Sequence, residues 1–290
     1  MTTGTLMRFE LSPTGPFSLE RSIDFASGFA PFGQSAHGSH LHLAFVPEGS
    51  EEAVGVCVRQ EGEAVVVESE EQVQDAVSRI LSVDIDASGL AAVGAADPVV
   101  ARLLSWYPSL RPVLFATPFE AAAWAVLSTR VQMRQAARLR SRMADELGTP
   151  VSIHGDVRQA FPAPSRIASH SSFRGLFGRK RDYLRELAAA ARAGRLSASR
   201  LRSLSPEAAL AELRRLPGIG EFGAELILIR RCGAPDVLPR AERRVLAAAA
   251  LAYGWPDASY DRFAEAAEAW RPFRSWVCFL LRKAYADGRL

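Results

Sequence analysis

The sequence predicts an α+β protein: an N-terminal antiparallel β-sheet domain with helices, followed by a mainly α-helical region. Three observations lead to this prediction. Short apolar or alternating runs, typical of strands, recur between residues 9 and 67. From residue 118 onwards, apolar residues recur mostly at helical spacing. Between residues 205 and 229, two helical runs flank a short turn that contains two glycines.

The length of 290 residues allows two or three domains with cores of their own, and the apolar content of 48% is ordinary for a globular protein. We expect divisions at residues 1–88, 89–204 and 205–290. No apolar run is long enough to span a membrane, and the N-terminus does not read as a signal peptide. Cys57, Cys232 and Cys278 lie far apart, which suits a reducing cytoplasm and provides no disulfide or iron–sulfur framework.

Charge is divided unevenly along the chain. Residues 1–100 hold 4 arginines against 15 acidic residues, a net of −11, while residues 101–290 hold 31 basic and 17 acidic residues, a net of +14. A basic region behind an acidic start favours nucleic-acid binding by the later part of the chain. The alternative is a solvated, arginine-rich surface from a biased genome, because only two of the basic residues are lysines.

The N-terminal domain should contain strands near residues 9–11, 40–43, 54–58 and 64–67, then a helix over residues 72–81. On a strand, His40 and His42 would share a face, and with His37 they invite a metal-site interpretation. No fourth ligand or cysteine pair lies near them in the sequence, so we favour a histidine-rich hairpin without a metal.

The middle of the chain begins with a Gly/Ala-rich link over residues 88–101. Thr117, Pro118 and Glu120 then predict a capped helix start. A second helix over residues 135–147 should turn its arginines outward. Residues 149–172 read as irregular. A helix is expected over residues 183–194.

The glycine turn comprises residues 214–220, Arg-Arg-Leu-Pro-Gly-Ile-Gly. Gly218 and Gly220 permit a sharp turn and a close approach by a partner. Their N–H groups should lie at the start of the second helix, where unpaired donors and the helix dipole favour an anion such as a phosphate. The alternative is a helix hairpin that merely turns on glycine.

This turn resembles the helix-hairpin-helix of the base-excision DNA glycosylases, and the chain is similar to the 3-methyladenine DNA glycosylase II family. The resemblance extends to the basic stretch at residues 173–184 and to residues 270–276, Trp-Arg-Pro-Phe-Arg-Ser-Trp. It implies a TBP-like N-terminal domain and a monomer that acts on double-stranded DNA, with no membrane or nucleotide cofactor. The implied reaction flips a damaged, alkylated base out of the duplex and hydrolyses its N-glycosidic bond.

The resemblance also implies site residues. Aligning Leu238-Pro239 with the family's motif places Glu242 at the catalytic aspartate, with Asp236 as the rival carboxylate; the alternative for Glu242 is a helix N-terminal acid. The implied DNA contacts are Arg130, as the residue that fills the gap in the duplex, and Arg179, Lys180, Gly218, Gly220 and Gly223. The implied base pocket comprises Phe222, Leu226, Arg243, Trp276 and Arg282. Main-chain carbonyls of Arg214, Leu216 and Ile219 would hold a monovalent cation.

Bifunctional relatives carry a nucleophilic lysine at the position of Phe222, so the resemblance implies a monofunctional enzyme without lyase activity. A second hypothesis is a non-catalytic protein that binds damaged DNA on the same fold, because Arg243, Arg282 and Glu242 differ from the aromatic pocket and the aspartate of relatives.

Overall fold

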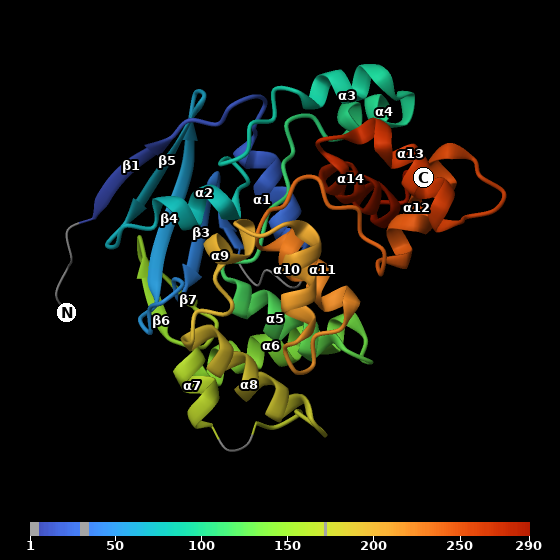
Figure 1. Ribbon diagram of the computed structural model, residues 1–290. Helices are drawn as coiled ribbons and strands as arrows, with labels where there is room; N and C mark the ends of the chain where they lie inside the picture. Colours follow the sequence, from blue (N-terminus) through green and yellow to red (C-terminus); the bar gives the residue numbers. More distant parts are fainter. Residues whose placement is uncertain (1–5, 30–34, 171–172) are drawn as a thin grey trace.

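The computed structural model describes residues 6–29, 35–170 and 173–290. It has the predicted α+β class: a five-stranded antiparallel sheet, in the order β1-β5-β4-β3-β2, precedes a helical region (Figure 1). The strands are β1 (Met7–Leu11), β2 (Ser35–His37), β3 (His40–Phe45), β4 (Val54–Glu61) and β5 (Ala64–Ser69). The helices of this part are α1 (Leu19–Gly28) and α2 (Gln74–Ile80).

Alternation along the strands decides which face of the sheet is buried by helices. Leu41, Leu43, Val56 and Val58 point to one face, where they pack with α1 and α2 in a common core. His42 and Cys57, which are directly paired across β3 and β4, lie on the other face. The sheet therefore has an aliphatic face and a second face with polar groups.

The helical region follows in chain order. Its helices are α3 (Leu90–Ala96), α4 (Pro98–Trp106), α5 (Pro118–Ser128), α6 (Met133–Leu147), α7 (Pro164–Ser169), α8 (Lys180–Arg192), α9 (Ala198–Arg202), α10 (Pro206–Arg214), α11 (Glu221–Arg230), α12 (Arg243–Tyr253), α13 (Tyr260–Ala267), η1 (Glu268–Trp270) and α14 (Arg274–Ala286). No described helix combines the length and the apolar character needed to cross a membrane.

Two helical cores divide this region, and one of them is discontinuous in sequence. Residues 115–237 share one core, which includes α5, α8 and the glycine hairpin. Residues 87–110 pack instead with residues 245–284, so α3 and α4 join the C-terminal helices. That residues 88 and 204 mark domain boundaries stays a prediction. The cores show that packing crosses them.

Two expectations about where regular structure is absent were wrong. The link over residues 88–101 contains α3 and the start of α4, because Asp97 Oδ1 accepts from the N–H of Val99 at 2.8 Å and caps the second of these helices. Residues 149–172 contain a β-hairpin, β6 (Pro150–Ile153) with β7 (Asp156–Gln159), and helix α7. His154 and Gly155 form its turn with φ of 48° and 87°, as tight hairpins require.

A buried arginine joins the sheet domain to the C-terminal helices. The Arg111 guanidinium donates five hydrogen bonds of 2.6–3.0 Å, all to backbone carbonyls of residues 14–16, 82 and 85. It also lies 5.8 Å from the ring centroids of Phe17 and Trp276. The carbonyls of two N-terminal segments are thereby fixed to the loop that precedes α5.

We predict that Arg111→Lys lowers the free energy of unfolding by about 3 kcal/mol or more, because a lysine has fewer donors and leaves buried carbonyls unpaired. The measurement is the urea midpoint. Arg21→Lys is the matched control, since Arg21 is exposed, and it should shift the free energy by about 0.5 kcal/mol at most. Equal midpoints for the two variants would show that the Arg111 contacts are not needed.

Candidate functional site

The glycine hairpin joins α10 to α11, as predicted, and its two glycines differ in their surroundings. Gly218 has φ of +81°, and a Cβ there would lie 2.6 Å from Cδ2 of Tyr183. Gly218 is therefore required by the fold itself. Gly220 has φ of −89°, and a Cβ there would meet no described atom within 4 Å. Its surroundings are open to a ligand.

Gly220 is also the N-cap of α11, and no described side chain caps that helix start. The first N–H groups of a helix need partners and carry the positive end of its dipole. Gly223, one turn into the helix, packs against α5, where a Cβ would lie 3.3 Å from Ala125 Cβ. The start of α11 thus offers donors to an anion, while its next turn is held close to α5.

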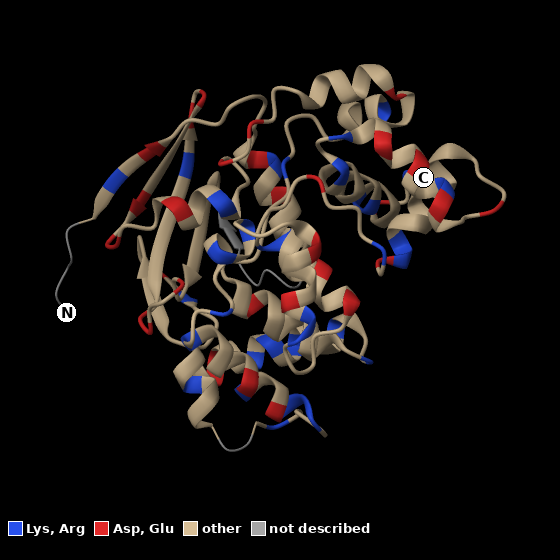
Figure 2. Ribbon diagram, in the orientation of Figure 1, with Lys and Arg blue, Asp and Glu red and all other residues tan. Residues whose placement is uncertain are grey.

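The two predicted basic residues at the start of α8 make different contacts, and Arg179 lies beside Tyr183, which packs against the hairpin at Gly218. The Arg179 guanidinium lies 5.1 Å from the Tyr183 ring centroid. Lys180 Nζ donates to the Leu127 carbonyl at 2.9 Å, near the end of α5, and burial lowers the pKa of Lys180. Lys180 therefore fixes α8 to α5 in the described structure. Figure 2 shows Lys and Arg gathered at the start of α8 and along α6, and acidic residues along the sheet.

Arg130 lies in the loop between α5 and α6. It is exposed and has φ of 56°, a left-handed conformation that is uncommon for a residue other than glycine. Such strain is often found where a side chain must be held at a functional surface. The loop starts two residues after the Leu127 carbonyl that Lys180 binds, so the loop of Arg130 and the start of α8 both lie at the end of α5.

A cavity of about 480 Å³ lies beside α11 and is lined by residues from α1, α5, α6, α11, α12 and α14. Of the predicted pocket residues, Phe222, Leu226 and Arg282 line it, together with Glu242. Further aromatic rings come from residues that were not predicted for the site: Phe25, Phe29, Trp124 and Phe279. Phe25 packs edge-on against Phe279 with centroids 4.9 Å apart. The cavity therefore offers aromatic surfaces of the kind that stack on a flat ligand.

The charged side chains that line the cavity are of both signs: four are basic (Arg230, Arg244, Arg282 and Lys283) and four are acidic (Asp24, Glu225, Glu242 and Asp287). The Arg230 guanidinium lies 4.5 Å from the Phe29 centroid and 5.3 Å from that of Phe279, and it donates to the Val113 carbonyl. Burial lowers the pKa of Arg230 to about 10, so it stays protonated at neutral pH. Burial also lowers the pKa of Arg282, which nearby Glu242 partly opposes.

Glu242 is half-buried at the wall of the cavity and caps α12, where Oε1 accepts from the Arg244 N–H at 3.1 Å. The alternative from the sequence, a helix N-terminal acid, is confirmed, and the same residue lines the cavity; its catalytic role stays a prediction. Its place depends on Glu225, which sequence reasoning missed. Both Glu225 oxygens accept backbone N–H groups, from Arg240 at 2.7 Å and Ala241 at 3.0 Å.

Glu225 is a positioning residue in this arrangement, because its carboxylate holds the two residues that precede Glu242. It lies in α11 and is almost fully buried, and burial raises its pKa against the opposing effect of the two N–H groups. The sequence signal that could have revealed Glu225 is its position as a charged residue among the apolar residues of α11.

Three predicted residues lie outside the lining of this cavity. Asp236 is engaged by Arg271 Nη1 at 2.7 Å and Arg274 Nε at 2.8 Å. Arg243 is exposed. Trp276 is buried in the C-terminal core, where its ring centroid lies 5.6 Å from that of Phe273. The geometry therefore favours Glu242 over Asp236 as the carboxylate that faces a ligand in the cavity.

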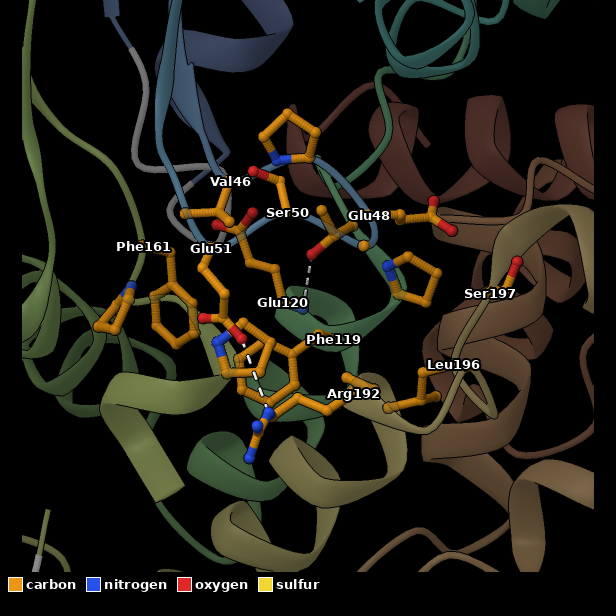
Figure 3. Close-up of a pocket in the computed structure, with 18 residues that line it drawn as sticks. Val46, Glu48, Ser50, Glu51, Phe119, Glu120, Phe161, Arg192, Leu196 and Ser197 are labelled. Atoms are coloured by element: carbon orange, nitrogen blue, oxygen red, sulfur yellow. Dashed lines mark hydrogen bonds and ion pairs between the residues drawn. The ribbon is translucent and has the colours of Figure 1, made fainter. Parts of the chain in front are cut away.

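A second cavity, of about 350 Å³, lies between the loop after β3 and the start of α5 (Figure 3). Its acidic side chains are already paired: Glu51 with Arg192 at 3.7 Å, Glu48 with Arg231 at 2.9 Å, and Glu120 with Arg140. None of the residues predicted for the site lines it. It is a gap at the junction of sheet and helices with its charges neutralised.

The fold is that of the helix-hairpin-helix DNA glycosylases, which confirms the predicted resemblance. A 3-methyladenine DNA-glycosylase from Archaeoglobus fulgidus superposes with a TM-score of 0.81 at 22% identity, over 98% of this chain and 99% of that one. An 8-oxoguanine glycosylase/lyase from Clostridium acetobutylicum, solved with double-stranded DNA, gives a TM-score of 0.69 at 17% identity, over 97% and 98% of the two chains.

In sequence, 200 residues are 27% identical to a Mycobacterium tuberculosis protein named as a probable bifunctional transcriptional activator/DNA repair enzyme AlkA. The alignment covers 69% of this chain and 40% of that protein, so the chain spans less than half of the relative's length. No protein-family profile matches the chain.

We predict that Gly218→Ala destabilises the protein, because the new methyl group meets the Tyr183 ring and φ is positive, whereas Gly220→Ala does not. The difference in unfolding free energy should be about 1–3 kcal/mol, from the strained conformation and the overlap. Thermal unfolding of both variants measures it. A Gly220→Ala variant as unstable as Gly218→Ala would show that Gly220 is needed for folding and is not simply left open for a ligand.

Proposed function

We propose that this protein is a base-excision DNA glycosylase that hydrolyses the N-glycosidic bond of a damaged base in duplex DNA. One observation carries the proposal: the aromatic cavity beside α11 has a carboxylate, Glu242, at its wall, and the same helix begins at the uncapped hairpin. The similarity to a 3-methyladenine DNA-glycosylase and to a probable DNA repair enzyme supports it.

The proposed steps follow from this geometry. A DNA phosphate binds the N–H groups at Gly218, Gly220 and Gly223, with Arg179 adding charge. The target base leaves the stack, and Arg130 occupies the gap, which reduces the unstacking cost of a few kcal/mol. The base stacks between aromatic rings of the cavity, where Phe222 is partly exposed at the start of α11. Glu242 then stabilises the positive charge that develops on the sugar as the base departs, and a water molecule from solvent adds to the sugar carbon that the base has left.

The charges of the cavity bear on the substrate. Acidic and basic side chains balance in its lining, but the Arg230 guanidinium already lies over the rings of Phe29 and Phe279, where a cationic base would otherwise gain attraction. We therefore propose alkylated bases as the substrate class, with neutral alkylated bases preferred over cationic ones. The aromatic rings can stack on either kind of base, and Arg230 on the faces of two of them disfavours the cationic kind.

The carbonyls of Arg214, Leu216 and Ile219 belong to the hairpin and its approach, and we propose that they hold a monovalent cation. Their donor set is entirely backbone oxygen, which suits a hard cation. The Leu216 carbonyl already accepts from the Ile219 N–H at 3.1 Å, and a carbonyl oxygen has a second lone pair for an ion. A cation there would supply positive charge to a bound phosphate. We propose that base release needs no other cofactor. We also propose that the protein is a monomer and acts in a reducing cytoplasm.

The base-release proposal makes Glu242→Gln the decisive variant. In single-turnover reactions on duplex DNA, we expect wild type to release an alkylated base and Glu242→Gln to slow that release by about 100-fold or more, because the developing sugar cation loses its counter-charge. Binding to a duplex that contains an abasic-site analogue should change little. A neutral ethenoadenine and a cationic 7-methylguanine should be tested together, the first being released faster.

Asp236→Asn is the comparison in the same assay. If Asp236→Asn releases the base slowly and Glu242→Gln releases it at the wild-type rate, Asp236 is the carboxylate that acts on the sugar. A second candidate function is binding of damaged DNA without catalysis, favoured by the Glu242 cap on α12, which commits one carboxylate oxygen to a backbone N–H. It requires that wild type binds lesion-containing duplex and releases no alkylated, deaminated or oxidised base.

We propose that base release occurs without strand cleavage. The chain has two lysines: Lys180 Nζ binds the Leu127 carbonyl, and Lys283 Nζ, at the cavity, binds the Asp287 carboxylate at 2.6 and 2.8 Å. Both amines are therefore engaged as hydrogen-bond donors, whereas a lysine that attacks the sugar must have its nitrogen free to form a bond. Borohydride treatment during turnover should therefore trap no protein–DNA cross-link. A cross-link that wild type forms and Lys283→Gln does not form would show that the enzyme is bifunctional, with Lys283 as its nucleophile.

A further inference from the structure

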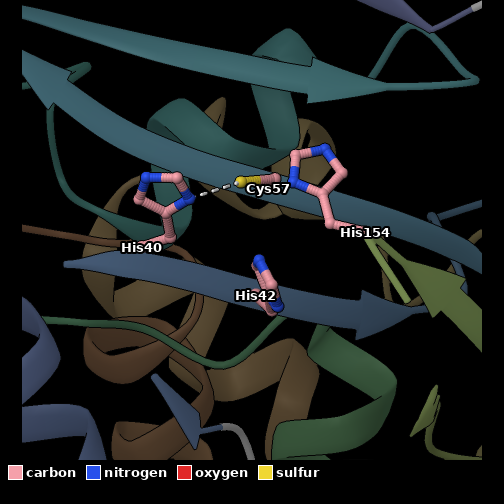
Figure 4. Close-up of side chains that lie close together, drawn as sticks. All are labelled: His40, His42, Cys57 and His154. Atoms are coloured by element: carbon pink, nitrogen blue, oxygen red, sulfur yellow. Dashed lines mark hydrogen bonds between the residues drawn. The ribbon is translucent and has the colours of Figure 1, made fainter. Parts of the chain in front are cut away.

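Four potential metal ligands meet on the polar face of the sheet, away from the cavity and hairpin. They are His40 and His42 of β3, Cys57 of β4 and His154 of the β6–β7 turn (Figure 4). One ligand atom from each lies within 4.8 Å of those of the others. From the sequence we favoured a hairpin without a metal, because no fourth ligand or cysteine pair lies near His37, His40 and His42 in the sequence. The fold supplies Cys57 and His154.

The strand register explains how three of the ligands come together. His42 and Cys57 are directly paired partners across β3 and β4. His40 lies two residues before His42 and therefore on the same face, where its Nδ1 is 3.6 Å from the Cys57 sulfur. A one-residue shift of register would separate them, so the group depends on the sheet as folded.

The fourth ligand comes from a segment about a hundred residues later in the chain. The β6–β7 hairpin lies against β4 at Gly55, where a Cβ would be 2.7 Å from Cγ1 of Ile153. Gly55 thus permits the close approach that places the next residue, His154, over the sheet. The rings of His42 and His154 have centroids 5.8 Å apart.

Carboxylates already orient two of the histidines. His42 Nδ1 donates to Asp156 Oδ2 at 3.1 Å, and His154 Nε2 lies 3.3 Å from Glu68 Oε2. In metal sites, a carboxylate on one ring nitrogen fixes the tautomer and leaves the other nitrogen as the ligand. The same two pairs could instead hold the hairpin to the sheet without any ion, and this is the alternative that an experiment must exclude.

We propose that His40, His42, Cys57 and His154 form a structural zinc site that fastens the β6–β7 hairpin to the N-terminal sheet. Three imidazoles and one thiolate are ligands that Zn²⁺ favours, in a closed tetrahedral set. With bond lengths of about 2.0–2.3 Å, tetrahedral ligands lie roughly 3.4 Å apart, so closure needs side-chain shifts of about an ångström. Cys57 and His42 are buried, while exposed His154 gives the ion a route in.

The test uses the full-length, untagged protein, stripped of metal and titrated with Zn²⁺ against a chromophoric chelator. Wild type should bind one equivalent, and thermal unfolding should shift upward with Zn²⁺. His154→Gln changes an exposed side chain and should weaken binding by about 100-fold or more, as a lost ligand would. His170→Gln, an exposed histidine outside the group, is the matched control and should bind as wild type does.

Two further readouts separate a metal site from a polar contact. Co²⁺ should give the intense visible bands of tetrahedral cobalt and a sulfur-to-metal charge-transfer band that Cys57→Ser removes. Asp156→Asn should weaken Zn²⁺ binding by about 10–100-fold through the orientation of His42. Equal Zn²⁺ binding by wild type and His154→Gln, or a cobalt spectrum without the sulfur band, would overturn the proposal. Base release by His154→Gln is expected to remain at the wild-type rate.

Discussion

The guanidinium of Arg111 holds together the two parts of the molecule that form the cavity. Its donors bind carbonyls of N-terminal segments, while the ring of Trp276 from α14 lies against it. The desolvation of a buried cation is offset here by carbonyl dipoles, and burial lowers the pKa of Arg111 to about 10, which leaves it charged at neutral pH. Because α1 and α14 both line the cavity, the position of the sheet domain matters to the site.

Much of the fold follows from local patterns in the sequence. The glycine hairpin, the valine-rich strands and the cap at Thr117 are each encoded within a few residues, so they could be predicted. The β6–β7 hairpin was missed because its His-Gly turn is an unusual form of a common signal. Arg140, expected to face solvent, is buried against Glu120 of α5. Such a pair depends on which helices become neighbours, and periodicity within one helix carries no information about that.

The candidate site shows the same limit. Glu242 could be placed from a short motif because the motif, the cap and the cavity wall occupy one stretch of chain. The aromatic rings of the cavity could not, since Phe25 and Trp124 come from helices far apart in sequence. Glu225 was missed because its partners are backbone N–H groups of a later loop. The zinc ligands likewise become neighbours only through strand register and the approach at Gly55.

We propose that the cavity beside α11 receives a nucleotide flipped from duplex DNA, with its sugar at Glu242. The most direct measurement is a crystal structure with duplex DNA that carries a cationic pyrrolidine in place of one sugar, a mimic of the charged transition state. We expect the pyrrolidine nitrogen to lie within about 4 Å of a Glu242 oxygen, and a phosphate to contact the N–H groups at Gly220. A pyrrolidine that remains within the duplex, or lies beside another carboxylate, would contradict it.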